Sequence, residues 1–514
     1  MILTRLLQSI GQQKDSAGAE TCQIGSIHYD SRDVIPNGLF VAIKGLQFDG
    51  HDYIDDAIQR GAKAIVAQYP LAADIPVFRV SDTRKALASL ADAFFDHPSQ
   101  ELTLVGITGT NGKTTTAYIL ESILKKSGFN VGVIGTVNYR YNQKEFDNPV
   151  TTPESLDLQR ILREMKTHGV SHVVVEVSSH AIDLDRIFRC DLDVAVFTNL
   201  SQDHLDYHRD MLSYWDCKKR LFTEYLVQGR DSHTKAAVIN TDSPQGRELI
   251  EEVSCPSVSV GHATKNQVHP LLVDMGLRGI SGTIEISGHT FPFQSKLAGR
   301  HNLENILCAA GAAVALAVSP QSIQAGIESI SAVPGRLQRV PGPADRPIFV
   351  DYAHTPDALE NVLQALKALN PDRLICVFGC GGDRDRAKRP MMGEISGRLS
   401  DLTIVTSDNP RMEKPAAIIA DILPGLKAVC SLEYLPGQLQ NGWQKKGFLV
   451  EPDRKQAIQL GIQASKAGDI VVIAGKGHET YQVVGDRILS FSDVEEALKV
   501  NNRLLNINRQ RTNE

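Results

Sequence analysis

The feature that most constrains the fold of this chain is the segment GITGTNGKTTT, which runs from Gly106 to Thr116. An apolar run, LTLV, precedes it and a helical pattern, AYILESILKKSG, follows it, which predicts a strand, a glycine-rich turn and a helix. The backbone amides of such a turn and the positive end of the helix can bind phosphate groups. Lys113 would then reach the β and γ phosphates, and the Thr114 hydroxyl would be a ligand for Mg²⁺. The strict pattern is missed at one place, because Ile107 stands where the first glycine belongs.

The nucleotide expected at this loop is ATP. No Asn-Lys-x-Asp segment, which would indicate a guanine nucleotide, follows the loop. The residues predicted to contact the ATP phosphates are Gly109, Thr110, Asn111, Gly112, Lys113, Thr114 and Thr115.

Two later segments carry candidate metal ligands. Glu176 ends the buried-looking strand VVVE, where a lone charge is costly unless it is paired or binds a metal. With a phosphate loop upstream, an acid that organises Mg²⁺ is favoured over an ion-paired glutamate. The segment TNLSQDHLDYH offers Asp203, His204, Asp206 and His208. The four-residue spacing of the two histidines is compatible with zinc on a helix, and packing or helix-capping roles stay equally open.

Length and strand order predict three α/β domains. A chain of 514 residues is too long for one hydrophobic core, and we expect domains at 1–98, 99–332 and 333–514. The middle domain has strands at βαβ spacing and should contain a mostly parallel P-loop sheet. The smaller N-terminal domain is also α/β. In the C-terminal domain, which is again α/β, apolar strands run directly into polar loops, where open parallel sheets bind ligands.

Composition excludes several classes of protein. A net charge of -6 and a pI near 6.2 provide no basic face for nucleic acid. The apolar run that begins at Cys308 is shorter than the roughly 18 residues of a membrane span, and the N-terminus lacks the pattern of a signal peptide. We therefore expect a soluble cytoplasmic protein without membrane insertion. Its eight scattered cysteines are expected to be reduced thiols.

Motifs spread over nearly the whole chain resemble the Mur ligases of peptidoglycan synthesis, in particular those that add 2,6-diaminopimelate. The resemblance rests on YDSR, GLFVAIKG, GTNGKTT, TTP, EVSSHA, NLSQDHLDYH, KKRLF, GRHNLENI, PGRLQ, DYAHTPDAL, GCGGDRDRAKRP, DNPR and AGKGHE, in the family's order. It implies a UDP-binding N-terminal domain, a central ATPase domain and a C-terminal Rossmann-like domain that receives the amino acid. It also implies a monomeric ligase that uses ATP and Mg²⁺ to join meso-diaminopimelate to the D-glutamate γ-carboxylate of UDP-MurNAc-L-Ala-D-Glu through an acyl phosphate. Such an enzyme serves cell-wall synthesis, and through it cell shape and division.

The resemblance implies roles for individual residues. Lys218 matches the family's carbamylated lysine, and this change from cation to anion suits a group that faces a second Mg²⁺. Its neighbour Lys219 is expected to be solvated. The expected catalytic residues are Lys113, Glu176, His204 and Lys218, and the expected metal ligands are Thr114, Glu176, His204 and Lys218. Those expected on the adenine and ribose side of ATP are Asn302, Arg336 and Asp351.

The UDP-MurNAc-dipeptide is expected to contact a further set of residues. Leu184 departs from the family, which usually has a glutamine contacting this substrate at that position. The expected contacts are Tyr29, Ser31, the segment Leu46–Phe48, Thr151, Thr152, Ser178 and Arg186.

The segment SDNPRMEKP carries the arginine that would select the amino acid. Diaminopimelate differs from lysine by a distal carboxylate, and the Arg411 guanidinium can bind that group through two parallel hydrogen bonds. Glu479 can accept hydrogen bonds from the distal ammonium. For an isolated arginine, a loop salt bridge would be the preferred interpretation. The full set expected to bind diaminopimelate is Arg384, Asp408, Asn409, Pro410, Arg411, Gly475 and Glu479.

Other functions are possible for a chain with these motifs. The first alternatives are a ligase of the same pathway that adds L-lysine and a folylpolyglutamate-type ligase. The latter should lack both the UDP-binding domain and DNPR. A further alternative is a P-loop switch that binds ATP and a partner, but such a protein would have no use for three ligand loops in its last domain.

Overall fold

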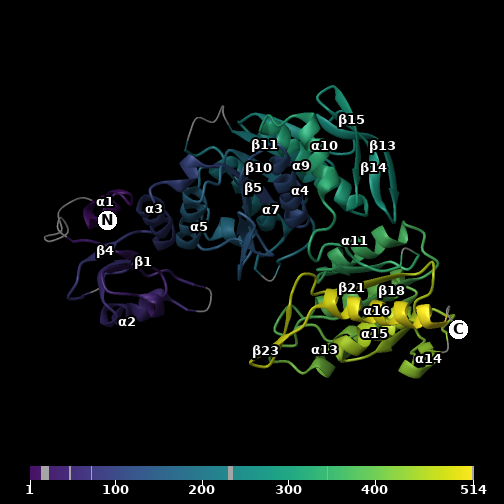
Figure 1. The fold of residues 1–514 in the computed structure, drawn as a ribbon. Helices are drawn as coiled ribbons and strands as arrows, with labels where there is room; N and C mark the ends of the chain where they lie inside the picture. The colour runs from purple at the N-terminus through teal and green to yellow at the C-terminus, as the bar shows by residue number, and fades with distance from the viewer. Residues whose placement is uncertain are drawn as a thin grey trace.

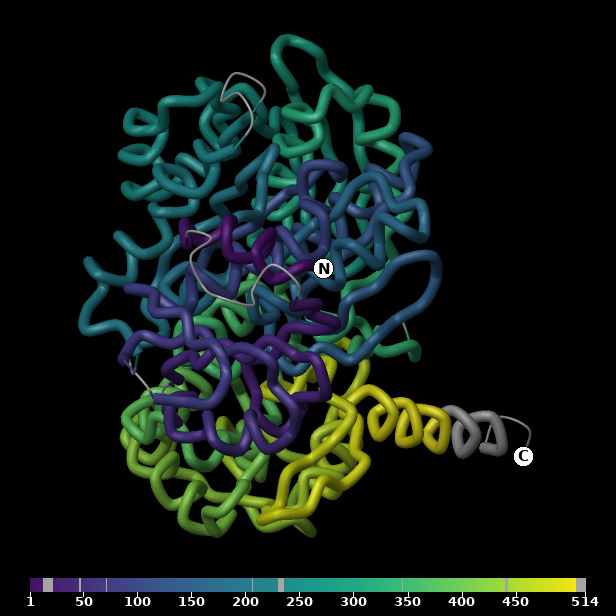
Figure 2. Tube along the Cα trace, turned by 90° about the vertical axis from the view of Figure 1, so that its left-hand side faces the viewer, coloured from purple at the N-terminus to yellow at the C-terminus, as the bar shows by residue number. Residues whose placement is uncertain are grey.

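The computed structural model describes residues 1–12, 22–45, 48–70, 72–205, 207–229, 235–343, 345–440 and 442–511. Three α/β units follow one another along the chain (Figure 1). The N-terminal unit faces the viewer in Figure 2, in front of the central and C-terminal units. The main sheets occupy 26–79, 103–295 and 338–474, and the domain limits at 98/99 and 332/333 stay a prediction.

The N-terminal unit has a four-stranded parallel sheet in the order β1-β2-β3-β4. Its strands are β1 (Ser26–His28), β2 (Gly38–Val41), β3 (Ala62–Ala67) and β4 (Val77–Arg79). Its helices are α1 (Leu3–Gln8), α2 (Ile54–Gln59) and α3 (Thr83–Phe94), with short 3-10 turns at Ser31–Asp33 and Gly50–Tyr53. Such a sheet requires a crossover connection between successive strands, which explains the alternation of strands and helical segments.

The central unit has an eleven-stranded sheet in the order β15-β14-β13-β12-β11-β10-β5-β9-β6-β7-β8. The strands from β13 across to β6 are parallel to their neighbours, and antiparallel hairpins extend both ends of the sheet. The strands are β5 (Thr103–Thr108), β6 (Val131–Ile134), β7 (Tyr139–Tyr141), β8 (Lys144–Phe146), β9 (His172–Glu176), β10 (Val194–Phe197), β11 (Ala236–Asn240), β12 (Ser257–Val260), β13 (Val268–Gly276), β14 (Gly279–Ile286) and β15 (His289–Ser295). The helices are α4 (Lys113–Lys126), α5 (Ser155–Thr167), α6 (Ser179–Asp183), α7 (Met211–Arg220), α8 (Pro244–Glu252), α9 (Arg300–Ala315) and α10 (Pro320–Ser329), with a 3-10 turn at Pro98–Glu101 and a π turn at Leu221–Tyr225.

Helices cover both faces of this central sheet. Val105 and Ile107 of β5 pack in one core with Ile119 of α4 and Ile306 of α9. Leu104, which precedes Val105 in the same strand, packs in a second core with residues of α5 and α7. Successive side chains of a strand point to opposite faces, so a strand that is apolar throughout needs helices on both sides.

The C-terminal unit has a six-stranded sheet in the order β16-β17-β21-β18-β19-β20, parallel except for β16. The strands are β16 (Gln338–Val340), β17 (Ile348–Asp351), β18 (Leu374–Phe378), β19 (Leu402–Val405), β20 (Gly447–Val450) and β21 (Ile470–Ala474), and the hairpin β22 (Tyr481–Val484) and β23 (Arg487–Ser490) follows. The helices are α11 (Pro356–Lys367), α12 (Lys388–Leu399), α13 (Pro415–Val429), α14 (Pro436–Gln440), α15 (Arg454–Ala464) and α16 (Asp493–Arg511). The carboxyl ends of the neighbouring strands β17, β21, β18 and β19 meet at one edge, where open α/β sheets bind ligands.

Two general expectations can be compared with the structure. The eight cysteines are free thiols, as predicted, and Cys376 and Cys380 are buried. Among the described residues, no helix has the length and apolar character needed to cross a membrane.

Candidate active site

The phosphate loop lies between β5 and α4, as predicted, and its two glycines are needed where they stand. Gly109 and Gly112 have φ values of 147° and 86°, which side chains rarely adopt. A Cβ atom on Gly109 would lie 2.0 Å from Thr198 Oγ1, and one on Gly112 would lie 2.1 Å from Asn305 Oδ1. The loop backbone is therefore held closely between β10 and α9.

Two lysines meet on this loop. The Nζ atoms of Lys113 and Lys218 both donate to the carbonyl oxygen of Gly109, at 2.8 and 2.9 Å. Lys218 is only 1% exposed, and burial, followed by the nearby charge of Lys113, lowers its pKa well below the usual value. Burial also lowers the pKa of Lys113. Lys219, expected to be solvated, instead pairs with Glu252 at 3.1 Å.

Glu176 lies at the end of β9, buried beside the phosphate loop. Its Oε2 accepts hydrogen bonds from Thr114 Oγ1 and Thr136 Oγ1, both at 2.9 Å, and its Oε1 accepts one from the Thr136 amide at 3.1 Å. No lysine, arginine or histidine within the described ranges forms an ion pair with it at 4.0 Å or less. Oxygen ligands of this kind suit Mg²⁺, so Thr114 and Glu176 fit the metal predicted here.

His204 lies in a turn before α7 rather than on a helix. The His208 amide donates to the His204 carbonyl oxygen at 2.8 Å, and His204 Nε2 is 3.5 Å from Asp203 Oδ2. Burial lowers the pKa of His204 to about 4, although Asp203 opposes that shift. The imidazole is therefore neutral at physiological pH and can offer a lone pair. Asp206 lies outside the described residues.

Asn302 connects to the phosphate loop through a second asparagine. Its Nδ2 donates to the Ala298 carbonyl oxygen at 2.7 Å, and its Oδ1 accepts from Asn305 Nδ2 at 3.2 Å. The Asn305 side chain is the one that packs against Gly112. The sequence motif GRHNLENI contains Asn305, but its pattern alone assigned that residue no role.

Arg336 reaches the loop from the start of the C-terminal unit. Its Nη2 donates to Thr114 Oγ1 at 3.3 Å. Asp351, at the end of β17, fixes the neighbouring backbone by accepting from the amides of Leu337 at 2.6 Å and Ala353 at 2.8 Å. The structure thus brings Arg336 to the nucleotide side, and Asp351 holds the turn that carries it.

The four central residues predicted to bind the muramoyl-peptide lie around Glu176. Thr152 Oγ1 donates to the Glu176 carbonyl oxygen at 2.8 Å and accepts from the Ser178 amide at 3.1 Å. Arg186 Nη1 donates to the Thr152 carbonyl oxygen at 3.0 Å. The Thr151 hydroxyl lies 3.1 Å from the hydroxyl of Thr136, which in turn donates to Glu176.

The residues predicted to bind uridine lie in the N-terminal unit. The Tyr29 hydroxyl donates to Asp157 Oδ2 of α5 at 2.7 Å and thereby joins this unit to the central one. Ser31 is buried at the start of a 3-10 turn. Leu46 and Gln47 lie outside the described residues.

A cavity of about 530 Å³ lies at the carboxyl edge of the C-terminal sheet. Asp203 and His204 of the central unit line it together with loops of the C-terminal unit. Of the predicted diaminopimelate-binding residues, six line it: Arg384, Asp408, Asn409, Arg411, Gly475 and Glu479. Pro410 stands between two of them in the chain.

Arg411 has a guanidinium available for a ligand. It has a φ of 51°, and its Nη1 donates to the Gly382 carbonyl oxygen at 2.8 Å. In the part of the chain that the structure describes, neither Arg411 nor Arg384 forms an ion pair with a carboxylate. The loop salt bridge that would explain an isolated arginine is thus not seen within that part.

A buried lysine holds two of the residues that line the cavity. Lys476 is fully buried, and its Nζ donates to Glu479 Oε2 at 2.7 Å and to Asn409 Oδ1 at 3.0 Å. Asn409 Nδ2 also donates to Glu479 Oε2, at 2.8 Å. Lys476 lies in the motif AGKGHE, but the sequence alone assigned it no role.

Two buried arginines hold the loops of the cavity together. Arg389 donates to the Gly381 carbonyl oxygen at 3.2 Å and to both carboxylate oxygens of Glu413, at 2.7 and 2.9 Å. These hydrogen bonds lower the pKa of Glu413 to about 2. Arg454 pairs with Asp493 at 2.7 Å and also donates to carbonyl oxygens after β19 and at the end of β21.

Asp357 joins the phosphate loop to the cavity at the edge of the C-terminal sheet. It stands at the start of α11, lines the cavity, and accepts through Oδ2 from Asn111 Nδ2 at 3.1 Å and Ser201 Oγ at 2.7 Å. Asn111 is fixed from the other side, since its amide donates to Asn199 Oδ1 at 2.9 Å. The sequence did not predict that Asp357, Ser201 or Asn199 belongs to the site.

Comparisons with known proteins agree with this arrangement. Family models match at residues 23–95 (Mur ligase family, catalytic domain), 107–313 (Mur ligase middle domain) and 335–477 (Mur ligase, glutamate ligase domain). A relative from Geobacter metallireducens, named UDP-N-acetylmuramoyl-L-alanyl-D-glutamate--2,6-diaminopimelate ligase, is 47% identical over 94% of this chain and 95% of its own length. The chain belongs to the Mur ligase family. A second relative of the same name, from Geobacillus kaustophilus, is 42% identical to this Mur ligase over 91% of the chain and 93% of its own length.

Solved structures share the fold of this Mur ligase. A structure of a UDP-N-acetylmuramoyl-L-alanyl-D-glutamate--2,6-diaminopimelate ligase matches with a TM-score of 0.69 and 28% identity, covering 98% of this chain and 99% of that one. The MurF ligase from Thermotoga maritima in complex with ADP matches with a TM-score of 0.62 and 21% identity, covering 94% and 98% of the two chains. The predicted fold class and family are therefore confirmed.

Proposed function

We propose that this Mur ligase joins meso-2,6-diaminopimelate to the D-glutamate γ-carboxylate of UDP-MurNAc-L-Ala-D-Glu, with ATP converted to ADP and phosphate. The observation that carries the proposal is the cavity that Arg384, Arg411 and Glu479 line together with His204 of the central unit. A diamino acid with two carboxylates needs both cationic and anionic partners, and this cavity offers both. The names of the two relatives support the same substrates.

The reaction follows from the placement of the charged groups. A γ-carboxylate oxygen attacks the terminal phosphorus of ATP, and ADP leaves, so that an acyl phosphate forms. The amine of diaminopimelate attacks the acyl carbon, loses a proton, and the tetrahedral intermediate expels phosphate. Lys113 and the loop amides stabilise the phosphate charge, and the cavity residues hold the amine near the acyl carbon.

Mg²⁺ is the metal that this donor set suits, and when bound it would neutralise phosphate charge. Thr114, Glu176, His204 and a carbamylated Lys218 would hold it. Burial favours the neutral amine of Lys218, which can add to CO₂ to give a carbamate and release one proton. The product is an anion beside Lys113, and the charge of that lysine stabilises it.

The remaining substrate contacts are part of the same proposal. Thr151, Thr152, Ser178 and Arg186 would bind the muramoyl-peptide, and Tyr29 with Ser31 would bind the uridine nucleotide. Asn302, Arg336 and Asp351 would bind or support the adenosine part of ATP. The enzyme would act as a monomer in the cytoplasm, on small-molecule substrates, in the synthesis of the cell-wall precursor.

The experiment that tests the proposal is ATP-dependent phosphate release by the purified protein with UDP-MurNAc-L-Ala-D-Glu. Each reaction contains meso-diaminopimelate, L-lysine, L-glutamate or no amino acid. We expect release only with diaminopimelate, together with an amide product whose mass equals that of both substrates less one water. Equal turnover with L-lysine would favour the lysine-adding ligase, and turnover with none of the amino acids would refute ligation.

A further inference from the structure

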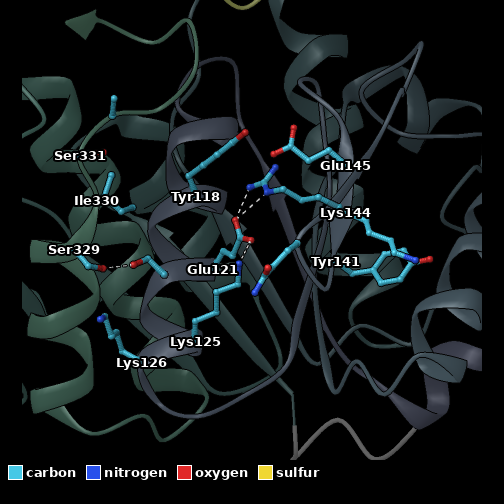
Figure 3. A pocket seen from close by; sticks show the side chains of 14 residues that line it. Tyr118, Glu121, Lys125, Lys126, Tyr141, Lys144, Glu145, Ser329, Ile330 and Ser331 are labelled. Carbon is cyan, nitrogen blue, oxygen red and sulfur yellow. Dashed lines mark hydrogen bonds and ion pairs between the residues drawn. The ribbon is translucent and has the colours of Figure 1, made fainter. Parts of the chain in front are cut away.

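A second cavity, of about 570 Å³, lies outside the proposed active site (Figure 3). Three elements line it: the second half of α4, the hairpin β7–β8, and residues 329–332, which lead from α10 toward the C-terminal unit. In Figure 3, Tyr118 and Lys125 come from the helix, and Lys144 comes from the hairpin. The volume lies within the range of roughly 300 to 1,000 Å³ that small-molecule sites occupy.

The floor of this cavity is a preformed ionic network. Arg140 is 8% exposed and lies 3.7 Å from the centre of the Tyr118 ring. It donates twice to Glu121 Oε2, at 3.0 and 2.5 Å, and Lys125 donates to Glu121 Oε1 at 2.7 Å. The second acid of the lining, Glu145, accepts from an asparagine amide at 3.0 Å. Both carboxylates are therefore already engaged.

Two cations of the lining are left without an acidic partner. Lys126 ends α4, Lys144 begins β8, and neither has an ion pair among the residues the structure describes. With Lys125 and Arg140, the lining has four cations against two carboxylates. Ser331 adds a hydroxyl from the third wall. Such a lining favours a ligand with several negative charges.

Each wall of this cavity continues into the active site. The helix that carries Lys126 begins at Lys113, and the turn before β7 carries Thr136, which holds Glu176. The segment 329–332 ends four residues before Arg336, which bonds to the phosphate loop. A ligand that draws the three walls together would therefore change the spacing of groups that contact ATP.

We propose that this cavity is a regulatory site for a small anion with two or more negative charges, bound by the cations of its lining, among them Lys126 and Lys144. Phosphate esters and polycarboxylates share that chemistry. Binding itself does not depend on the reaction catalysed, whereas its effect on turnover rests on the proposed ligase function. The two parts can therefore fail separately.

The first test measures binding without turnover. The full chain is saturated with ADP, which occupies the phosphate loop, and is titrated calorimetrically with citrate and separately with inorganic pyrophosphate. We expect at least one probe to bind, and the double variant Lys126→Ala/Lys144→Ala to bind it at least about tenfold more weakly. The control is Lys63→Ala, which removes an exposed lysine of β3 and should leave binding unchanged.

A second variant tests the third wall. Ser331→Glu places a negative charge in the cavity and should weaken binding to a similar extent, with an unchanged melting temperature. In the ligase assay, the bound probe should change the KM for ATP of the wild type and leave that of the double variant unchanged. Absence of binding by both probes up to about 10 mM, or equal binding by the double variant, would overturn the site. Binding lost in the double variant, with no effect on wild-type turnover, would overturn the regulatory role alone.

Discussion

Replacing Arg411 by alanine should remove the preference for diaminopimelate over L-lysine. The Arg411 side chain is fixed by one hydrogen bond to a carbonyl oxygen, at 2.8 Å, and its other N–H groups can serve a ligand. Its φ of 51° is strained for arginine and for alanine alike, so the substitution adds no new backbone strain. The effect of the substitution on activity can therefore be assigned to the loss of the guanidinium.

The expected loss can be worked from the two hydrogen bonds that a carboxylate would receive. A hydrogen bond to a charged group contributes about 1.5–3 kcal/mol. Water that enters the emptied space offsets part of the free energy lost with the two bonds. A net loss of about 3 kcal/mol corresponds to a decrease of roughly 150-fold in kcat/KM for diaminopimelate. L-Lysine lacks the distal carboxylate, so its kcat/KM should change little.

The assay measures phosphate release with each amino acid in the wild type and in Arg411→Ala. The matched control is Arg503→Ala, which removes an exposed arginine of α16 in the same unit. We expect the ratio of kcat/KM for diaminopimelate to that for lysine to approach one only in Arg411→Ala. If that variant keeps the wild-type ratio, Arg411 does not read the distal carboxylate.

Three further predictions concern Lys218, Asp357 and three histidines. Lys218→Ala should lower turnover by about 10³-fold. Turnover of the wild type should fall in bicarbonate-free buffer and recover when bicarbonate is added back. If turnover of the wild type does not depend on bicarbonate, Lys218 carries no carbamate. Asp357→Asn keeps the shape but removes the charge that receives hydrogen bonds from Asn111 and Ser201 of the central unit. The KM for ATP should therefore rise about tenfold with an unchanged melting temperature, and unaltered kinetics would show that Asp357 has no such role. Burial lowers the pKa of His204, His301 and His478 from 6.5 to about 4. Between pH 6.5 and about pH 4, these histidines are therefore protonated in the unfolded chain and neutral in the folded one. The free energy of unfolding, measured by urea titration, should therefore decrease as the pH is lowered from 7 to 5. The decrease should be smaller in His301→Gln, and a free energy of unfolding that does not change with pH would contradict these pKa values.

The sequence alone determined those features that depend on neighbouring residues. The turn around Lys113 needs two glycines in unusual conformations, a lysine and the start of a helix, and all of them lie within a few residues of one another. The alternation of apolar strands with helices likewise predicted a mostly parallel sheet. The family motifs, including DNPR around Arg411, are also continuous segments. Local geometry and motif order therefore follow from the order of the amino acids itself.

Only the tertiary structure decided how distant segments complete the site. Asn111 and Asp357 are 246 positions apart, and their hydrogen bond exists because the central and C-terminal units pack against each other. Lys218 owes its low pKa to burial beside Lys113, and the amphipathic segment around it looked like an ordinary surface helix. Burial and contacts between units arise from packing of the whole chain, so no pattern in a single segment can specify them.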